Sequence, residues 1–234
     1  MYDLWNTLAA RAGRELTTPQ HDLLSRYLDL LLAANQTMNL TGIVERSAAE
    51  VHHVADALTL LPFIPAEAVS IADVGAGGGV PGIPLAIALP ACNVLLIEST
   101  KKKAAFLQRA VAELGLTNVR VSDERAEDVG IGGRRQSFDV VVARAVATMG
   151  WLAEWCLPLA KNGGKMLAMK GKRGPDELAA ALHAIRLLGG GDAATHPIEL
   201  PGTDSHVVIE IPKIARTPSK YPRPATIAKG NALA

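Results

Sequence analysis

The chain has few aromatic residues, few cysteines and no long hydrophobic run, and each shortage excludes a class of protein. Aromatic side chains make up 4% of the 234 residues, so a nucleic-acid surface of stacked rings is not expected. The two cysteines, Cys92 and Cys156, cannot form a disulfide framework and lack zinc-site spacing. No apolar run reaches the roughly 18 residues that span a bilayer, and residues 1–16 do not resemble a signal peptide. We therefore expect a cytoplasmic protein without a membrane partner.

What the sequence does contain is enough aliphatic material for one large core and an uneven charge distribution. Hydrophobic residues make up 49% and charged residues 20%, as is typical of a globular protein. The net charge is +1, yet residues 212–234 hold five basic residues and no acidic one. This tail predicts either a polyanion partner or a solvated arm that aids solubility. Its four prolines predict an extended arm and no regular helix.

The order of apolar patterns predicts an α/β fold with a doubly wound, mostly parallel, seven-stranded sheet. From residue 66, short apolar runs alternate with helical patterns, which indicates parallel strands covered by helices on both faces. We expect an N-terminal helical cap (1–65), the α/β domain (66–212) and the basic arm (213–234). The expected helices are 4–12, 18–35, 48–61, 80–88, 100–114, 148–160 and 176–188. The expected strands are 69–74, 93–98, 119–122, 138–143 and 164–169, with a closing antiparallel pair at 199–200 and 206–211.

A glycine-rich loop follows the first expected strand and indicates a cofactor site. The spacing of Gly77, Gly79 and Gly82 matches that of dinucleotide-binding loops, so a nicotinamide cofactor must be considered. Asp73 would oppose a pyrophosphate but suits an ammonium group, and Glu98, at the end of the next strand, can accept both ribose hydroxyls. These two acids favour S-adenosylmethionine, which has an amino group and no phosphate. The residues expected to hold it are Asp73, Gly75, Gly77, Gly79 and Glu98.

The third and fourth strands end near two further candidate contacts. Backbone amides near Ala126 and Glu127 are placed to recognise adenine, although an acidic helix start is an equal alternative. Arg144 ends the fourth strand, where enzymes that methylate exocyclic amines carry a proline-aromatic motif that this chain lacks. Neither cysteine is placed for nucleophilic catalysis, and packing is expected for both. Guanine N7 needs no deprotonation, so positioning it near the methyl group, at ~3 Å, suffices. Arg144 then contacts the cofactor, a phosphate or guanine O6, or pairs with a carboxylate.

Several basic residues are candidates for RNA binding, since phosphate contacts position an RNA without reading its sequence. They are Lys101, Lys102, Lys103, Lys170, Lys172, Arg173, Lys220 and Arg223. For the first three, a solvated helix start is equally consistent with the pattern. Arg134 and Arg135 lie in a glycine-rich loop and are expected to be solvated. His53 and Asp56 share a helical face, where we expect packing and orientation ahead of proton transfer.

Six segments resemble, in this order, the bacterial small-subunit ribosomal RNA guanine-N7 methyltransferases, a family once named glucose-inhibited division protein B. They are Asn39-Leu40-Thr41, His53-x-x-Asp56, DVGAGGGVPGIPLAI from Asp73, VVARAVA around Arg144, Met169-Lys170-Gly171 and KYPR at 220–223. The resemblance covers most of the chain, and the extension VPGIP at 80–84 is specific to this family. The run Lys101–Lys103 and the tail after Pro224 depart from the family pattern.

The resemblance implies a fold, a reaction and a set of contacts. The fold is that of class I S-adenosylmethionine-dependent methyltransferases. The reaction is methylation of guanine N7 in 16S ribosomal RNA or the small subunit, by family at guanine 527 of the 530 loop. Cofactor contacts are implied at Gly75, Val80, the Ala126–Glu127 backbone and Arg144. We expect a monomer. The alternatives are a small-molecule methyltransferase, a nicotinamide-dependent oxidoreductase and a non-catalytic RNA-binding protein.

Overall fold

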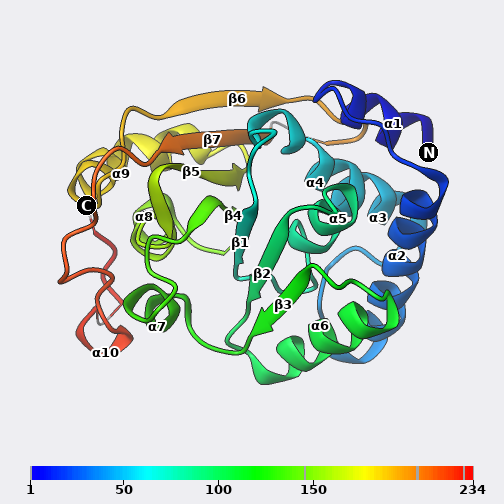
Figure 1. Cartoon of the computed structure of the whole chain (residues 1–234), viewed down its shortest axis with the longest axis horizontal. Coiled ribbons are helices and arrows are strands. Elements are labelled where there is room, and N and C mark those ends of the chain that lie inside the picture. The colour runs from blue at the N-terminus through cyan, green and yellow to red at the C-terminus, as the bar shows by residue number, and fades with distance from the viewer. Residues whose placement is uncertain (1, 145, 204–205, 229, 234) are drawn as a thin grey trace.

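Seven strands form one sheet in the computed structural model, which describes residues 2–144, 146–203, 206–228 and 230–233. The strand order is β3-β2-β1-β4-β5-β7-β6 (Figure 1). Strands β1 to β5 are parallel, and β7 runs antiparallel to both β5 and β6. The predicted doubly wound, mostly parallel sheet is thus confirmed. The strands are β1 (Ser70–Val74), β2 (Asn93–Ile97), β3 (Val119–Ser122), β4 (Phe138–Arg144), β5 (Ala160–Lys170), β6 (Ala194–Ile198) and β7 (His206–Pro212).

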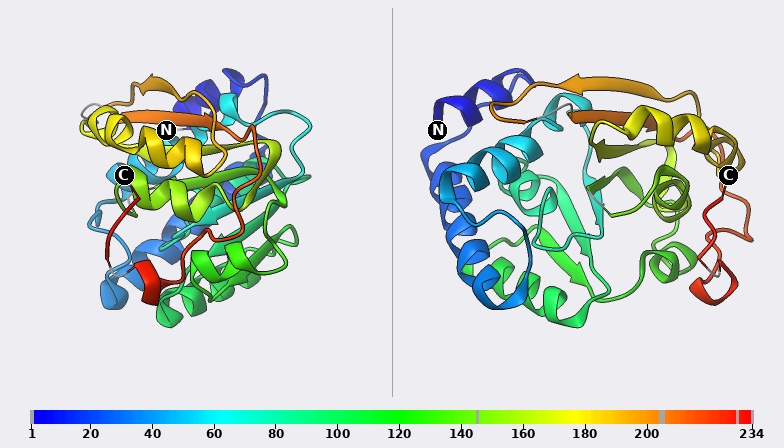
Figure 2. Two further views of the ribbon diagram at one scale, coloured as in Figure 1. Left: turned by 90° about the vertical axis from the view of Figure 1, so that its left-hand side faces the viewer. Right: turned by 180° about the vertical axis from the view of Figure 1, so that it is seen from behind.

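Helices cover both faces of the sheet (Figure 2), because successive side chains along each strand point to opposite faces. Ile71 and Leu96 pack with the N-terminal helices, α5 and α6. Ala72 and Leu95, their neighbours in sequence, pack with α7, α8 and α9. The helices are α1 (Tyr2–Ala10), α2 (Thr18–Met38), α3 (Arg46–Ala49), α4 (Asp56–Leu58), α5 (Gly82–Ala88), α6 (Lys101–Glu113), α7 (Ala126–Ile131), α8 (Met149–Cys156), α9 (Gly174–Leu187) and α10 (Ala225–Ala228).

Helix α2 connects the N-terminal helices to the loop after β1. It begins with a capping box in which the Thr17 N–H donates to Gln20 Oε1 at 2.8 Å and Thr17 Oγ1 accepts from the Gln20 N–H, so two end groups are satisfied. It ends at Asn39, whose left-handed conformation reverses the chain. From its buried face, the Tyr27 hydroxyl donates to the Gly78 carbonyl at 2.8 Å. The cap therefore contacts the glycine loop directly.

The chain between α3 and α4 is wound as a π-helical turn, η1 (Glu50–Ala55). Together with α3 and α4 it forms one continuous helical stretch over 46–58, and a short 3-10 turn, η2 (Leu61–Phe63), follows. The predicted helix at 48–61 is therefore confirmed over most of its length, although its winding is not regular. Such wide turns occur mostly as isolated features at functional sites, and this one contains His53.

The sheet edge and the tail differ from the sequence-based expectation. The strand that pairs with β7 is β6, so the expected position at 199–200 is wrong by a few residues. Pro197 lies within β6, which the sheet tolerates because β6 is an edge strand. In the tail, residues 225–228 form α10 directly after Pro224, so the expectation of no regular helix is also wrong there. Proline at a helix start loses no internal hydrogen bond.

The C-terminal arm is fixed by two basic side chains, the half-buried Arg135 and the buried Lys213. Arg135 Nη1 donates to the Tyr221 carbonyl at 2.6 Å, and its Nη2 donates to the Thr217 carbonyl at 2.8 Å. The expectation that Arg135 is solvated is therefore wrong, because carbonyls of the arm replace its water. The Lys213 ammonium is buried and donates to the Leu188 carbonyl at 2.7 Å and to the Thr217 hydroxyl. Burial lowers the pKa of Lys213 to about 7.

None of the helices in the described ranges is both long and apolar enough to cross a membrane.

Candidate functional site

The glycine loop makes a sharp turn at the carboxyl end of β1. Gly75, Gly77 and Gly79 have φ values of +73°, +55° and +97°, in the region that favours glycine. An added Cβ at Gly75 would lie 2.6 Å from Val146 Cγ2. In front of this loop is a cavity of about 360 Å³, which we call the loop cavity. It is lined by Leu31, Leu40, Thr41, His53, Gly75, Ala76, Gly77, Gly78, Val80, Glu98, Lys103, Arg144 and Val146.

The structure brings together some of the predicted cofactor residues and not others. Five of them line the loop cavity: Gly75, Gly77, Val80, Glu98 and Arg144. Gly79 lies beneath the loop, where an added Cβ would meet Ile83 Cδ1 at 2.6 Å. Asp73 is fully buried and is not among the lining residues, and neither are Ala126 and Glu127. They begin α7, where the first backbone N–H groups have no acceptor within the helix, and their role in adenine recognition stays a prediction.

Asp73 is fully buried at the end of β1, under the glycine loop. Its Oδ2 accepts from the Gly82 N–H at 2.8 Å, whereas Oδ1 has no hydrogen-bond partner in the described part of the chain. Burial raises the pKa of Asp73 to about 7, against the opposing effects of the Gly82 hydrogen bond and Arg144. A buried oxygen without a donor costs stability, and an ammonium group would supply both the donor and the charge.

Glu98 fits a diol. Its Oε2 accepts from the Gly77 N–H at 3.0 Å, and its Oε1 accepts from the Thr100 N–H at 2.7 Å. These bonds hold the carboxylate at the edge of the loop cavity. A carboxylate has about four acceptor positions, so each oxygen can also accept from one ribose hydroxyl. The orphaned oxygen of Asp73 and this carboxylate together match the amino and ribose groups of S-adenosylmethionine.

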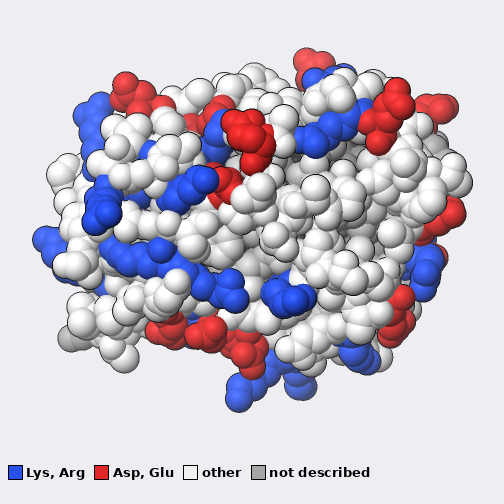
Figure 3. All heavy atoms as spheres, in the orientation of Figure 1, with Lys and Arg blue, Asp and Glu red and all other residues white. Residues whose placement is uncertain are grey.

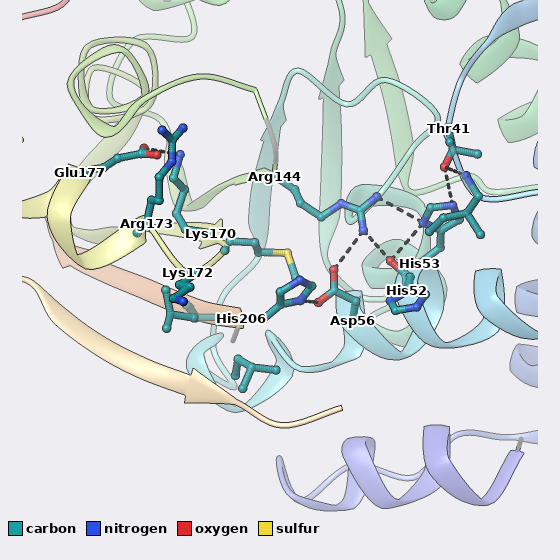
Figure 4. Close-up of a pocket in the computed structure, with 18 residues that line it drawn as sticks. Thr41, His52, His53, Asp56, Arg144, Lys170, Lys172, Arg173, Glu177 and His206 are labelled. Carbon is teal, nitrogen blue, oxygen red and sulfur yellow. Dashed lines mark hydrogen bonds and ion pairs between the residues drawn. The ribbon is translucent and has the colours of Figure 1, made fainter. Parts of the chain in front are cut away.

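A second cavity, of about 670 Å³, adjoins the first, and we call it the outer cavity (Figure 4). It lies between η1, the ends of β4 and β5, and the start of β7. Arg144, His53 and Thr41 line both cavities. The others that line the outer cavity are Gly42, Ile43, His52, Asp56, Met169, Lys170, Gly171, Lys172, Arg173, Gly174, Glu177, Ile198, His206, Val207 and Val208.

Arg144 is the central side chain of the junction between the cavities. From β4 it reaches η1 and the start of α4, where its Nη1 donates to the His52 carbonyl at 2.6 Å and to Asp56 Oδ2 at 3.0 Å (Figure 4). Its Nη2 lies 3.3 Å from His53 Nδ1. Asp56 is buried, and its Oδ1 lies 3.5 Å from His206 Nδ1. Arg144 thus pairs with a carboxylate, one of the roles that the sequence left open.

Burial keeps His53 and the two cysteines in their uncharged forms. Burial, with Arg144 second, lowers the pKa of His53 to about 4, so its imidazole is neutral at pH 7. Burial raises the pKa of both thiols, that of Cys92 to about 11 and that of Cys156 further. Both cysteines are free and buried, as the sequence predicted. Covalent catalysis by a thiolate is not supported by these positions.

The predicted RNA-binding residues differ in how far their side chains are exposed to solvent, where an RNA could reach them. Lys172 and Arg173 are exposed at the border of the outer cavity. Lys101 and Lys102 are exposed at the start of α6, and Lys103 lines the loop cavity. Lys220 is exposed, with its Nζ 5.3 Å from the Tyr221 ring centroid.

Two of these predicted residues are already paired with carboxylates of the protein. Lys170 is mostly buried and contacts Glu177 Oε2 at 2.6 Å and the Ala147 carbonyl at 2.7 Å. Arg223 forms a two-pronged pair with Glu154, at 2.8 and 2.7 Å. Glu154 is only 1% exposed. These contacts give both residues a structural role.

Some residues of the junction were missed as individual candidates. Thr41 and His52 enter through the loop after α2 and through η1, and His206 enters through β7. No spacing in the sequence brings these segments to Arg144. The resemblance did include Asn39-Leu40-Thr41, but it assigned Thr41 no role.

A sheet of this order, with a glycine loop after β1 and an acid after β2, defines a class I S-adenosylmethionine-dependent methyltransferase. The family model described as rRNA small subunit methyltransferase G matches residues 20–203. The chain belongs to this family of S-adenosylmethionine-dependent methyltransferases.

Curated relatives agree with the family, and solved structures agree with the fold. The chain is 43% identical over 212 residues to "Ribosomal RNA small subunit methyltransferase G" of Chloroflexus aggregans, covering 90% of this chain and 89% of the relative. The protein of the same name from Macrococcus caseolyticus is 42% identical over 213 residues, covering 90% of each chain. Cofactor-bound Rv0187 from MTB has a TM-score of 0.59 at 20% identity, covering 81% of this chain and 91% of that chain. A 16S rRNA adenine-N1 methyltransferase from Catenulisporales acidiphilia has a TM-score of 0.54 at 16% identity, covering 65% and 88%. The two structures support the fold alone.

The raised pKa of Asp73 predicts that cofactor binding depends on pH. An ammonium group binds the ionised carboxylate, which is the minor form below pH 7. The Kd for S-adenosylhomocysteine, which carries the same amino group, should therefore rise about tenfold per pH unit from pH 7 to pH 5. It should level off above pH 7. Calorimetric titration between pH 5 and 7.5 checks this slope.

The matched control for this dependence is Asp73→Asn, which has no proton to gain in that range. Its affinity should be weaker at pH 7 and nearly independent of pH. An equal slope in both proteins would assign the pH dependence to another group and contradict the pairing of Asp73 with the amino group.

Proposed function

We propose that this chain transfers the methyl group of S-adenosylmethionine to N7 of a guanine in 16S ribosomal RNA. One observation carries the proposal: two cavities meet at Arg144, one bordered by the glycine loop and the other by Lys172 and Arg173. The loop cavity takes the cofactor, and the outer cavity takes the target nucleotide. The family and the names of the relatives support the substrate class.

In this proposal the chain's own residues position the two reactants, and none of them acts as a general base. When bound, S-adenosylmethionine supplies an electrophilic methyl group on a positively charged sulfur. Asp73 holds the amino group, Glu98 the ribose, and the junction residues orient the guanine so that N7 faces the loop cavity. N7 has a free lone pair, so no proton has to leave before methyl transfer. Catalysis then rests on placement of the two reacting atoms.

The electrostatics of the junction suit a reaction that leaves a cation on the base. The charge of Arg144 is balanced by Asp56 at 3.0 Å, and His53 is neutral because its pKa is about 4. Neither group therefore adds a net positive charge beside the purine. A protonated histidine in this position would oppose the positive charge that moves from the cofactor to the base.

We propose that the RNA follows the exposed basic residues at the mouths of the two cavities: Lys101, Lys102, Lys172 and Arg173, with Lys103 at the cofactor. On the face seen in Figures 1 and 3, further Lys and Arg side chains gather over the left half, where α7, α9 and α10 lie. Lys220, on the arm, remains a candidate. We leave out Lys170 and Arg223, because Glu177 and Glu154 already neutralise them.

The three predicted parts of the chain have separate roles in this proposal. Residues 1–65 cap the cofactor, residues 66–212 form the methyltransferase body, and residues 213–234 extend the basic surface. We propose a monomer that acts in the cytoplasm, because no step requires a second copy and the substrate is ribosomal.

Reversing the charge at Lys172 and Arg173 should weaken RNA binding. The double variant Lys172→Glu, Arg173→Glu should bind 16S RNA about tenfold or more weakly and show a shallower dependence of affinity on salt, because fewer counterions are released. Filter binding at several salt concentrations measures both quantities. Arg186→Glu is the matched control, since its side chain is 72% exposed on α9 away from the cavities. The double variant changes the net charge by −4 and the control by −2, so a general effect of net charge would give the control about half of the logarithmic loss in affinity.

The reaction itself is tested with labelled S-adenosylmethionine and small subunits, or their RNA, from cells that lack this protein. Transfer of label to one guanine, followed by the strand cleavage diagnostic of N7-methylguanine, is the expected result. Cofactor binding without transfer to RNA or subunits would overturn the proposed substrate and favour the alternative, a methyltransferase acting on a small molecule.

A further inference from the structure

The junction between the cavities contains a short chain of hydrogen bonds whose directions can be assigned. It runs from Arg144 through His53 to Thr41, and all three residues line both cavities. A guanidinium has five N–H donors and no acceptor. Because Arg144 Nη2 lies 3.3 Å from His53 Nδ1, this nitrogen accepts and carries no proton.

The remaining proton of the neutral imidazole is therefore on Nε2. The His52 carbonyl also lies 3.1 Å from His53 Nδ1 and could accept a second hydrogen bond, but a proton on Nδ1 would face the Arg144 Nη2 donor at 3.3 Å. His53 Nε2 lies 3.0 Å from Thr41 Oγ1, so it donates to this hydroxyl. Arg144, which only donates, thus fixes the tautomer of the histidine.

Thr41 receives a second hydrogen bond at the same oxygen. The Ile43 N–H donates to Thr41 Oγ1 at 3.1 Å, so both lone pairs of the hydroxyl are used. The Thr41 N–H donates to Asn35 Oδ1 at 2.9 Å, which holds the residue in place. Over the described ranges, no protein acceptor is recorded for the hydroxyl hydrogen. The Thr41 hydroxyl is thus an oriented donor at the junction.

We propose that the Thr41 hydroxyl donates to the carbonyl oxygen O6 of the target guanine and selects guanine over adenine. This inference rests on the proposed function. In guanine, O6 and N7 are neighbouring acceptors on one edge, so a base that presents N7 to the loop cavity presents O6 to the same junction. Adenine has an amino group in place of O6, and its N–H would face the hydroxyl hydrogen. Thr41 is therefore a specificity-determining residue.

Arg144 acts in this arrangement as a positioning residue and does not contact O6. Its contacts with Asp56, the His52 carbonyl and His53 use both N–H groups of Nη1 and one N–H of Nη2. Its effect on the base passes through the tautomer of His53. The arginine thereby places a neutral donor beside the purine, which opposes the developing cation less than a direct guanidinium contact does.

The first test compares Thr41→Val with Thr41→Ser. The valine keeps the shape and removes the donor, and the serine keeps the hydroxyl. We expect Thr41→Val to lower kcat/KM with small subunits or their RNA by about 10- to 100-fold, with the Kd for S-adenosylhomocysteine within about twofold of wild type. Thr41→Ser should recover to within about threefold. A role confined to packing would not give this rescue.

The second test leaves the protein unchanged and alters the base, so it holds even if Thr41→Val folds poorly. RNA with 2-aminopurine at the methylated position keeps N7 and lacks O6. The wild-type enzyme should lose about the same factor on this RNA as Thr41→Val loses on guanine. Thr41→Val should then lose little more on 2-aminopurine, because the two changes remove one shared contact.

Two results would overturn the inference. Full activity of the wild-type enzyme on 2-aminopurine would show that O6 is not contacted. A matching loss of cofactor affinity in Thr41→Val would place the hydroxyl on the cofactor. Both results leave guanine-N7 methylation in place. Failure of the proposed function is seen separately, as the absence of N7-methylguanine with the wild-type enzyme.

Discussion

Gly77→Asp should reduce affinity for S-adenosylhomocysteine by at least about 1,000-fold, because the new side chain fills the cofactor site and repels Glu98. Gly77 lines the loop cavity, and its N–H donates to Glu98 Oε2 at 3.0 Å. An added Cβ there meets nothing closer than the Gly75 carbonyl oxygen, at 3.7 Å. Aspartate also tolerates the positive φ of this position better than most residues. The variant should therefore fold, and calorimetry should show no binding.

Gly77→Ala is the matched control for this substitution. It adds the Cβ and its backbone strain without the carboxylate, and the expected loss is less than about tenfold. Circular dichroism and the melting temperature of both variants show whether the fold is retained. Tight binding of the cofactor by a folded Gly77→Asp variant would remove the loop cavity as its site.

Arg223→Ala should destabilise the protein by about 3 kcal/mol, because it leaves the buried Glu154 carboxylate without its partner charge. This corresponds to a fall in melting temperature of about 6–12 °C for a chain of this size. Lys220→Ala, at an exposed position three residues earlier, should change stability by less than about 0.5 kcal/mol. Scanning calorimetry or thermal melts measure the difference.

The role of Arg223 is decided by a second variant. Glu154→Gln with Arg223→Ala should recover part of the lost stability, since no buried charge is then unpaired. A normal melting temperature for Arg223→Ala, together with weaker RNA binding, would instead support the role that the sequence predicted.

The sequence predicts the cofactor half of the site because local spacing and topology are sufficient there. Asp73 and Glu98 follow neighbouring strands, and parallel strands bring their carboxyl ends to one edge of the sheet. The junction was not predictable in this way. Arg144, His53 and Thr41 come from β4, η1 and the loop after α2, and only tertiary packing brings them within hydrogen-bond distance.

Charge was the least predictable property of individual residues. In the sequence, Lys170, Lys213 and Arg223 look like cations that a ligand could reach. In the fold, Lys170 pairs with Glu177, seven residues away, and the other two are buried or paired by partners distant in sequence. Arg135 looked like a solvated loop residue because nothing in its own segment indicates that residues 217–221 return to it. A sequence gives the sign of a charge, and the fold decides whether a ligand can reach it.

The contacts of Arg135 also determine how much the arm can vary during evolution. Among the residues that the structure describes, the guanidinium donates only to main-chain oxygens, those of Gly130, Thr217, Pro218 and Tyr221. Every amino acid supplies such an oxygen, so exchange of the side chain at 218 leaves this attachment in place. The path of the arm therefore depends on its main chain and little on which side chains it carries. Exposed positions along it are free to acquire or lose charge while the arm keeps its course over the body of the enzyme.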